Sequence, residues 1–187
     1  MKVTSVAGAT LAVLLGVHAH AADADAHLTL SSKDFTAGAR LAEAQVYRGY
    51  GCQGGNVSPA LSWSGAPPET QSFALLVHDP DAPHRGGWWH WVVYDLPRGA
   101  TSLAAGAGDP QKALLPQGAR QGRSDFGTAA YGGPCPPPGP PHHYHFRLYA
   151  LKVSHLELPA EASAAAIAAA AQAQALASTE LVGLYGR

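Results

Sequence analysis

Acidic and imidazole side chains gather in residues 77–96, VHDPDAPHRGGWWHWVVYDL. Asp79, Asp81 and His84 stand close together there, and His90 follows a few residues later. Carboxylates and imidazoles in contact can transfer protons, orient one another or bind a charged ligand. A lone histidine on an apolar strand is usually a core residue bonded to a carbonyl. These polar neighbours favour a functional site for His90 instead.

Two apolar runs, residues 72–77 and 91–94, flank this stretch and are rich in β-branched and aromatic residues. Such residues suit a half-buried sheet, whereas the prolines and glycines between the runs predict an ordered loop carried by two strands. Alternation along a strand from 89 to 96 places His90 on one face. The other members of that face are Val92, Tyr94 and Leu96, and the opposite face holds Trp89, Trp91, Val93 and Asp95.

Residues 142–151, HHYHFRLYAL, predict a further strand. Its apolar face holds His142, Tyr144, Phe146, Leu148 and Ala150, so His142 and Tyr144 are expected at the rim of the core. His143 and His145 share the solvent face with Arg147, whose charge disfavours a bound cation there. We therefore predict neither a metal nor a cofactor.

Predicted strands recur about every ten residues between glycines and prolines, which is typical of an all-β sandwich or barrel. Two more short strands are expected at 27–30 and 60–63, and residues 49–59 are expected to form a loop. Residues 98–123 predict a long connection with at most one short helical or extended piece. The proline-rich stretch 124–141 predicts a pinned loop, with a flexible linker as the alternative.

The chain ends in an alanine-rich segment that predicts a helix from about 159 to 177. The helix is expected to pack through alanines, with Ile167 and Leu176 as its main apolar residues. Residues 181–185 are expected to add a short strand or a cap.

The first 21 residues predict a secretory signal peptide, which leaves one domain at 22–187. Lys2 precedes the apolar run 3–17, and Ala19-His20-Ala21 has the form of a signal-peptidase site. A membrane anchor is the alternative, but the run is short for a span, so we expect no stable membrane insertion. The formal net charge of −1 is scattered along the chain, which argues against nucleic acid as a partner.

The two cysteines, Cys52 and Cys135, are predicted to form a disulfide between two glycine-rich loops. Exported thiols tend to pair, and neither cysteine lies in a CxxC motif. Two unpaired thiols are the alternative.

Three motifs in order resemble the phosphatidylethanolamine-binding protein family, most closely its bacterial, Raf kinase inhibitor-like branch. They are DPDAP at 79–83 with WWHW at 88–91, YGGPCPPPG at 131–139, and HxYxFxLYAL from His142. The resemblance implies a Greek-key β-sandwich with a C-terminal helix, a small anion pocket, and a cis bond before Pro83. By motif position the pocket residues would be Asp79, Asp81, His90, Gly133, His142 and Tyr144.

These features predict a periplasmic or secreted binding protein, not an enzyme, for a small phosphorylated or carboxylate ligand such as a phospholipid head group. The two pocket imidazoles, the phenol and the amides of Gly132 and Gly133 are the expected donors. One alternative is a module that inhibits a protein partner such as a kinase or protease. Another is a hydrolase using Asp79, His90 and His142, although no activated nucleophile accompanies them.

Overall fold

The computed structural model describes Met1 and residues 27–187. Apart from Met1, the predicted signal peptide lies outside the described residues. The strands are β1 (Thr29–Ser32), β2 (Arg48–Gly49), β3 (Cys52–Gln53), β4 (Leu61–Ser64), β5 (Ser72–Asp79), β6 (Trp88–Pro97), β7 (Ser102–Leu103), β8 (Arg120–Gln121), β9 (His142–Leu151) and β10 (Ala175–Tyr185). The helices are the 3-10 helix η1 (Pro110–Lys112) and the α-helix α1 (Ala164–Ala173).

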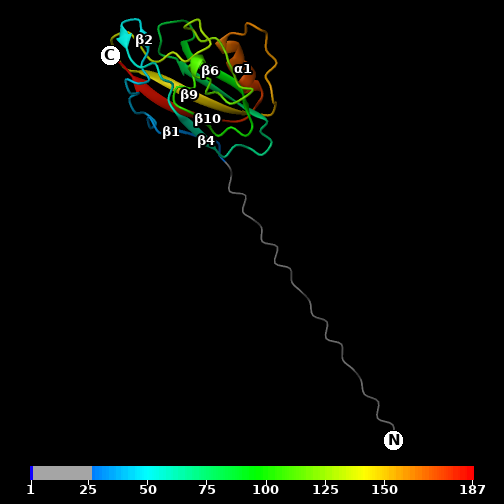
Figure 1. The fold of residues 1–187 in the computed structure, drawn as a ribbon. Helices are drawn as coiled ribbons and strands as arrows, with labels where there is room; N and C mark the ends of the chain where they lie inside the picture. The colour runs from blue at the N-terminus through cyan, green and yellow to red at the C-terminus, as the bar shows by residue number, and fades with distance from the viewer. Residues whose placement is uncertain (2–26) are drawn as a thin grey trace.

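Two antiparallel sheets form a sandwich, as the strand spacing predicts. The larger sheet has the order β10-β9-β5-β6-β8, the smaller has the order β1-β4-β7, and β2 and β3 make a separate pair. Helix α1 lies on the side of the larger sheet away from β1 and β4 (Figure 1). The larger sheet is therefore the middle of three layers.

Each face of the larger sheet buries its own apolar cluster. Phe73, Leu75 and Val77 of β5 pack toward the smaller sheet, whereas Ala74 and Leu76 pack toward the helix. This alternation along β5 is the pattern of a strand covered on both sides. It explains why β5 is apolar at every position from Phe73 to Val77.

Strand β6 departs from regular alternation at two places. Its pairing with β5 passes from Val77↔Trp91 to His78↔Trp89, so His90 is an extra residue on β6. A second shift between Phe73 and Leu75 adds another residue near Asp95, which has a positive φ of 55°. Each is a β-bulge, which changes the side a side chain faces.

The prediction that His90, Val92, Tyr94 and Leu96 share one face of β6 is therefore wrong in part. Val92 and Tyr94 pack toward the helix, whereas Leu96 packs in the core between the sheets. His90 meets Tyr144, a residue of that same inter-sheet core, across a ring-centroid distance of 5.0 Å. The bulge thus turns His90 away from the face of Val92, with which simple alternation grouped it.

Strand β9 has the predicted bounds and the predicted parity. Tyr144, Phe146, Leu148 and Ala150 are buried between the sheets, and His143 is exposed. No register shift interrupts its pairing with β5 from Ser72↔Leu151 to His78↔His145. Alternation predicts β9 correctly because β9 itself carries no extra residue in its pairing with β5.

The C-terminal segment differs from the prediction. Helix α1 begins only after Ser163, whose hydroxyl accepts from the Ala166 amide, and it ends before Gln174. The following eleven residues form β10, which pairs with β9 from Ala175↔Leu151 to Tyr185↔His142. Leu176 consequently lies on β10, where it is exposed. Without β10 this edge of β9 would have no partner strand. The hydrogen bonds that β10 forms there outweigh the helix propensity of its alanines.

The connections also hold more structure than predicted. Residues 98–123 contain β7, η1 and β8, and residues 49–59 contain part of the β2–β3 pair. In the proline-rich stretch, residues 131–134 are buried, so this segment is a pinned loop. None of the helices in residues 27–187 has the length and apolarity needed to cross a membrane.

Candidate functional site

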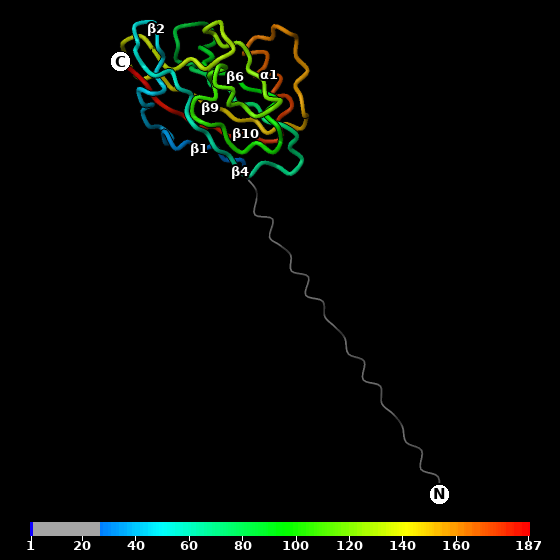
Figure 2. Tube along the Cα trace, in the orientation of Figure 1, coloured from blue at the N-terminus to red at the C-terminus, as the bar shows by residue number. Residues whose placement is uncertain are grey.

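One end of the sandwich holds a cavity of about 490 Å³. The end of β5, the start of β6, the start of β9 and the C-terminal residues meet there. In Figure 2 the C-terminus and β2 lie at this same end, and Arg187 hydrogen-bonds to the Tyr50 carbonyl beside β2. The titratable side chains lining the cavity are Tyr50, Asp79, His84, His90, His142, Tyr144 and Arg187.

Asp79 and His142 form a buried pair in the cavity wall. Oδ2 of Asp79 lies 2.7 Å from Nδ1 of His142. Oδ1 of Asp79 accepts from the backbone amides of Asp81 and Ala82 at 2.9 and 3.1 Å. With both of its oxygens engaged, Asp79 holds the Nδ1 proton of His142 and leaves Nε2 of that ring as its free nitrogen. Asp79 thus orients a neighbour and stabilises the turn that follows β5.

His90 is buried and donates from Nδ1 to the Gly132 carbonyl at 2.7 Å. Burial lowers the pKa of His90 to about 4, because desolvation outweighs the favourable effects of the Gly132 carbonyl and Asp79. His90 is therefore neutral at neutral pH. Because its Nδ1 already donates to a carbonyl, only Nε2 of this ring is left for another partner.

Tyr144 presents a hydroxyl that has no hydrogen-bond partner among residues 27–187. The side chain is 1% exposed, and its ring packs edge-on against His90. Burial, with the nearby Asp79 charge, raises the pKa of Tyr144 above its ordinary value, so the phenol stays protonated. A buried hydroxyl without a partner costs free energy, and a ligand oxygen in the cavity would satisfy it.

Two of the predicted pocket residues do not line the cavity. Gly133 donates its amide to Oδ1 of Asn56 at 2.8 Å, and a Cβ on Gly133 would lie 1.9 Å from the Gln45 carbonyl oxygen. Asp81 points outward and accepts from both the backbone amide and Nδ1 of His143. The amide of Gly132 is also engaged, since it donates to the His90 carbonyl at 2.9 Å. Both amides are therefore engaged within the protein, and both glycines are closely packed.

The predicted cis bond before Pro83 is wrong, because residues 27–187 contain no cis peptide bond. Asp79 caps the start of this turn, as its contacts with the next amides show. The His84 amide then donates to the Ala82 carbonyl at 2.7 Å, which makes Pro83 the centre of a γ-turn. The fixed φ of proline suits that turn with a trans bond.

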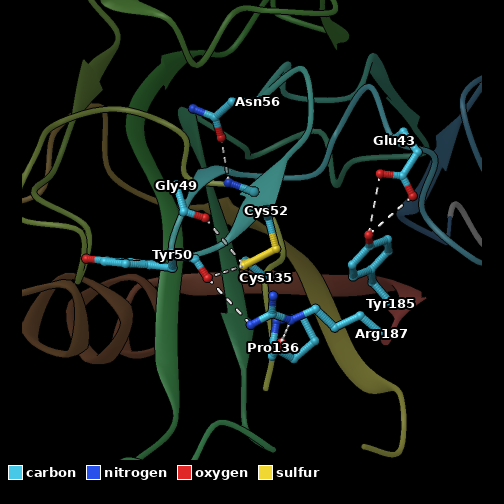
Figure 3. Close-up of a disulfide and its surroundings, with 10 residues drawn as sticks. Glu43, Gly49, Tyr50, Cys52, Asn56, Cys135, Pro136, Tyr185 and Arg187 are labelled. Atoms are coloured by element: carbon cyan, nitrogen blue, oxygen red, sulfur yellow. Dashed lines mark hydrogen bonds between the residues drawn. A yellow bond between two sulfur atoms is a disulfide. The ribbon is translucent and has the colours of Figure 1, made fainter. Parts of the chain in front are cut away.

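A disulfide joins Cys52 to Cys135, as predicted, and Cys135 lines the cavity. Arg187 reinforces this wall by donating from Nε to the Pro136 carbonyl at 2.6 Å (Figure 3). The sequence analysis missed Arg187 as a lining residue. The only signal for Arg187 in the sequence is its cationic side chain, two residues after the strand β10 that pairs with β9.

Aromatic rings complete the cavity wall. Trp88 packs edge-on against Phe126 at 5.6 Å and lies 4.7 Å from the His84 ring. Phe126 also meets His90 at 5.4 Å, and Tyr50 lies at the mouth with 67% of its surface exposed. The polar groups therefore sit in an apolar setting that strengthens their interactions. Within residues 27–187, no cluster of three or more metal-ligand side chains accompanies them.

Residues 31–186 match the family model described as phosphatidylethanolamine-binding protein. The chain belongs to the phosphatidylethanolamine-binding protein family. Among curated Escherichia coli proteins, it is 44% identical over 157 residues to the UPF0098 protein YbcL, covering 83% of this chain and 86% of YbcL. It is also 37% identical over 158 residues to the UPF0098 protein YbhB, covering 84% of this chain and 99% of YbhB.

Solved structures show the same fold. The crystal structure of Escherichia coli YbcL, described as a new member of the mammalian PEBP family, superposes with a TM-score of 0.83 at 42% identity, covering 86% of this chain and 99% of that chain. The homologue CT736 from Chlamydia trachomatis gives 0.72 at 32% identity, covering 87% and 99%. The predicted Greek-key sandwich of this family is confirmed, and membership supports a binding protein.

Proposed function

We propose that this protein captures a small anion in the cavity at the end of the sandwich and does no chemistry on it. The ligand class is a phosphate ester or a carboxylate, such as a phospholipid head group. The single observation that carries the proposal is the Tyr144 hydroxyl, which is buried and unpartnered among the described residues and belongs to a residue that lines the cavity together with His142 and Arg187.

Three groups support anion capture by their chemistry. The Tyr144 phenol is a donor, and Nε2 of His142 becomes one when the ring is protonated. Arg187 lines the cavity as a fixed cation, and its Nε is already held by the Pro136 carbonyl. A donor held in place by the protein loses little entropy when a ligand binds.

The proposal of a non-enzymatic role rests on the side chains that line the cavity. They include no serine, threonine or lysine, and Cys135 is tied up in the disulfide. Asp79, the one carboxylate of the lining, has both oxygens engaged. An activated nucleophile of the usual kind is therefore missing from the lining.

We also propose that the protein acts in the periplasm or outside the cell. The disulfide supports this location, because such bonds persist in oxidising compartments. N-terminal sequencing of the protein recovered from the periplasm should find a chain that begins at Ala22. A chain that retains Met1 in the cytosol would overturn the location.

Calorimetric titration of O-phosphoethanolamine tests the binding function. Wild type should bind it, and His142→Ala and Tyr144→Phe should each weaken binding at least about tenfold, because each removes a hydrogen bond to a charged group worth about 1.5–3 kcal/mol. His155→Ala is the matched control, since His155 is exposed and pairs with Asp95 at the far end of β6. His143→Ala serves as a second control on the outer face.

Two results would overturn the proposal. The first is a wild-type protein that binds neither O-phosphoethanolamine nor acetate at millimolar concentration. The second is turnover of phosphate or carboxylate esters that disappears in His142→Ala, because it would make the cavity an active site.

A further inference from the structure

Building on the proposed anion pocket, we propose that the cavity selects oxyacids that still carry a hydrogen on one oxygen. The favoured ligand is a phosphate monoester in its singly charged form. Among the anions of the proposed class, fully ionised sulfate esters and carboxylates of similar size bind more weakly. The geometry of His90 carries this inference.

His90 presents a hydrogen-bond acceptor to the cavity. Its Nδ1 lies 2.7 Å from the carbonyl oxygen of Gly132, and a carbonyl can only accept, so Nδ1 bears the proton. Nε2 of the same ring then carries a lone pair. Nε2 has no hydrogen bond to any of residues 27–187, and His90 lines the cavity.

The surroundings of His90 keep it in this form. The residue is 4% exposed, its ring packs between Tyr144 and Phe126, and burial lowers its pKa to about 4. A ligand oxygen that reaches Nε2 must therefore donate a hydrogen to it. An ionised oxygen would face the lone pair with no hydrogen between them, which leaves two buried acceptors unpaired.

The rest of the cavity presents donors. The unpartnered hydroxyl of Tyr144 donates to a ligand oxygen, and His142 does so when it is protonated. A singly charged phosphate monoester matches both requirements, because it has one P–OH group and two oxygens that accept. A sulfate ester has the same shape and charge but no O–H.

Charge favours the same ligand. The titratable and charged groups that face the cavity are Tyr50 between β2 and β3, Asp79 on β5, His84 in the loop, His90 on β6, His142 and Tyr144 on β9, and Arg187 after β10. His78 on β5 lies close enough to act on His90 through its charge. The buried carboxylate of Asp79 repels a second negative charge, and Arg187 is the only fixed cation in the lining, so a dianion is disfavoured.

The test compares O-phosphoethanolamine with ethanolamine O-sulfate by calorimetry on the wild-type protein. At pH 6 the phosphate ester should bind at least about 100-fold more tightly, because a site built to bond an O–H group rejects analogues that lack it. From pH 6 to pH 8 its affinity should fall about 50-fold. The singly charged form drops from about half to about one hundredth of the ester over that range, since the second pKa of such esters is about 6.

A variant links the preference to His90. His90→Gln replaces the acceptor by an amide that can rotate to donate, so the ratio of the two affinities should shrink to about tenfold or less. Circular dichroism and a thermal melt show whether the variant is folded. The comparison of the two esters on wild type needs no variant and decides the question if His90→Gln fails to fold.

The outcomes separate the two proposals. Tight phosphate binding with weak sulfate binding at pH 6, together with a phosphate affinity that falls toward pH 8, supports the selectivity. Equal affinity for the two esters, or tighter sulfate binding, overturns the selectivity and leaves the anion pocket standing. If neither ester binds, the proposed function falls together with the selectivity.

Discussion

The two faces of β9 each begin with a histidine bonded to an aspartate, and the two pairs differ only in their surroundings. On the inner face Nδ1 of His142 lies 2.7 Å from Asp79, and on the outer face Nδ1 of His143 lies 2.7 Å from Asp81. The inner side chains are 14% and 4% exposed, whereas the outer ones are 54% and 42% exposed. Residue types and His–Asp distances are the same, so the pairs differ in burial and in the backbone amides that each carboxylate accepts.

This difference shows why distance is a poor guide to energy or function. Water screens the outer pair and competes for its hydrogen bonds, so the pair contributes little. The inner pair is largely shielded from water, and losing one partner leaves a polar group unsatisfied. The outer face continues with Arg147 and His145, both paired with Glu180.

The largest expected effect is the loss of stability when the disulfide in the cavity wall is removed. Replacing both Cys52 and Cys135 by serine should destabilise the protein by about 4.5 kcal/mol, because the disulfide closes a loop of about 84 residues in the unfolded chain. Urea denaturation of oxidised wild type and of the double variant measures it. Reduced wild type should unfold like the variant. A difference under about 1 kcal/mol would contradict the prediction.

A matched pair of substitutions tests the comparison directly. Asp79→Ala should cost about 4 kcal/mol of unfolding free energy, because it removes a buried partner of His142 and the acceptor for two loop amides. Asp81→Ala should cost about 1 kcal/mol or less, as expected for an exposed pair. Denaturant unfolding of both variants checks this. Equal losses would show that burial does not distinguish the two pairs.

As pH falls, the inner face should lose its contribution to folding stability at a higher pH than the outer face. The folded-state pKa of His90 is about 4, against about 6.5 unfolded, so between these values the unfolded chain binds a proton that the folded protein does not. Stability from neutral His90 is complete above pH 6.5 and is lost as pH falls through 4, by about 3 kcal/mol in total.

Unfolding free energies of wild type and His90→Gln from pH 7 to 4 measure this loss. The two curves should converge toward acid, because only wild type carries the titrating ring. Asp81 differs, since His143 lowers its pKa below 3.8 and its contribution is lost only in stronger acid. Parallel curves for wild type and His90→Gln would rule out the assignment to His90.

The smallest effect concerns the backbone behind the cavity. Gly133→Ala should cost about 2 kcal/mol, because the new Cβ would lie 1.9 Å from the Gln45 carbonyl oxygen, a backbone atom that cannot turn aside. Gly99→Ala is the control, since nothing lies within 4 Å of a Cβ at Gly99. Thermal unfolding of both variants provides the measurement. An unchanged midpoint for Gly133→Ala would show that the backbone relaxes freely.

The sequence by itself determined the features that follow from local pattern. Alternation of apolar and polar residues located β9 and its inner face, and the ordered motifs identified the family and its sandwich. The even count of cysteines in glycine-rich loops was enough to predict their pairing. Each of these signals lies in a short stretch of sequence or in a simple count. They can therefore be interpreted without knowing which elements are neighbours in the fold.

Only the tertiary structure decided how the side chains of the site are oriented and which groups they bond to. The bulge at His90 depends on the pairing of β6 with β5, and it sets which side that ring faces. The neutral state of His90 follows from burial among rings distant in sequence. The amide of Gly133 donates to Oδ1 of Asn56 because the loop that holds Asn56 lies beside the loop that holds Gly133. Long-range contacts set burial, and burial determines which of two identical hydrogen bonds matters.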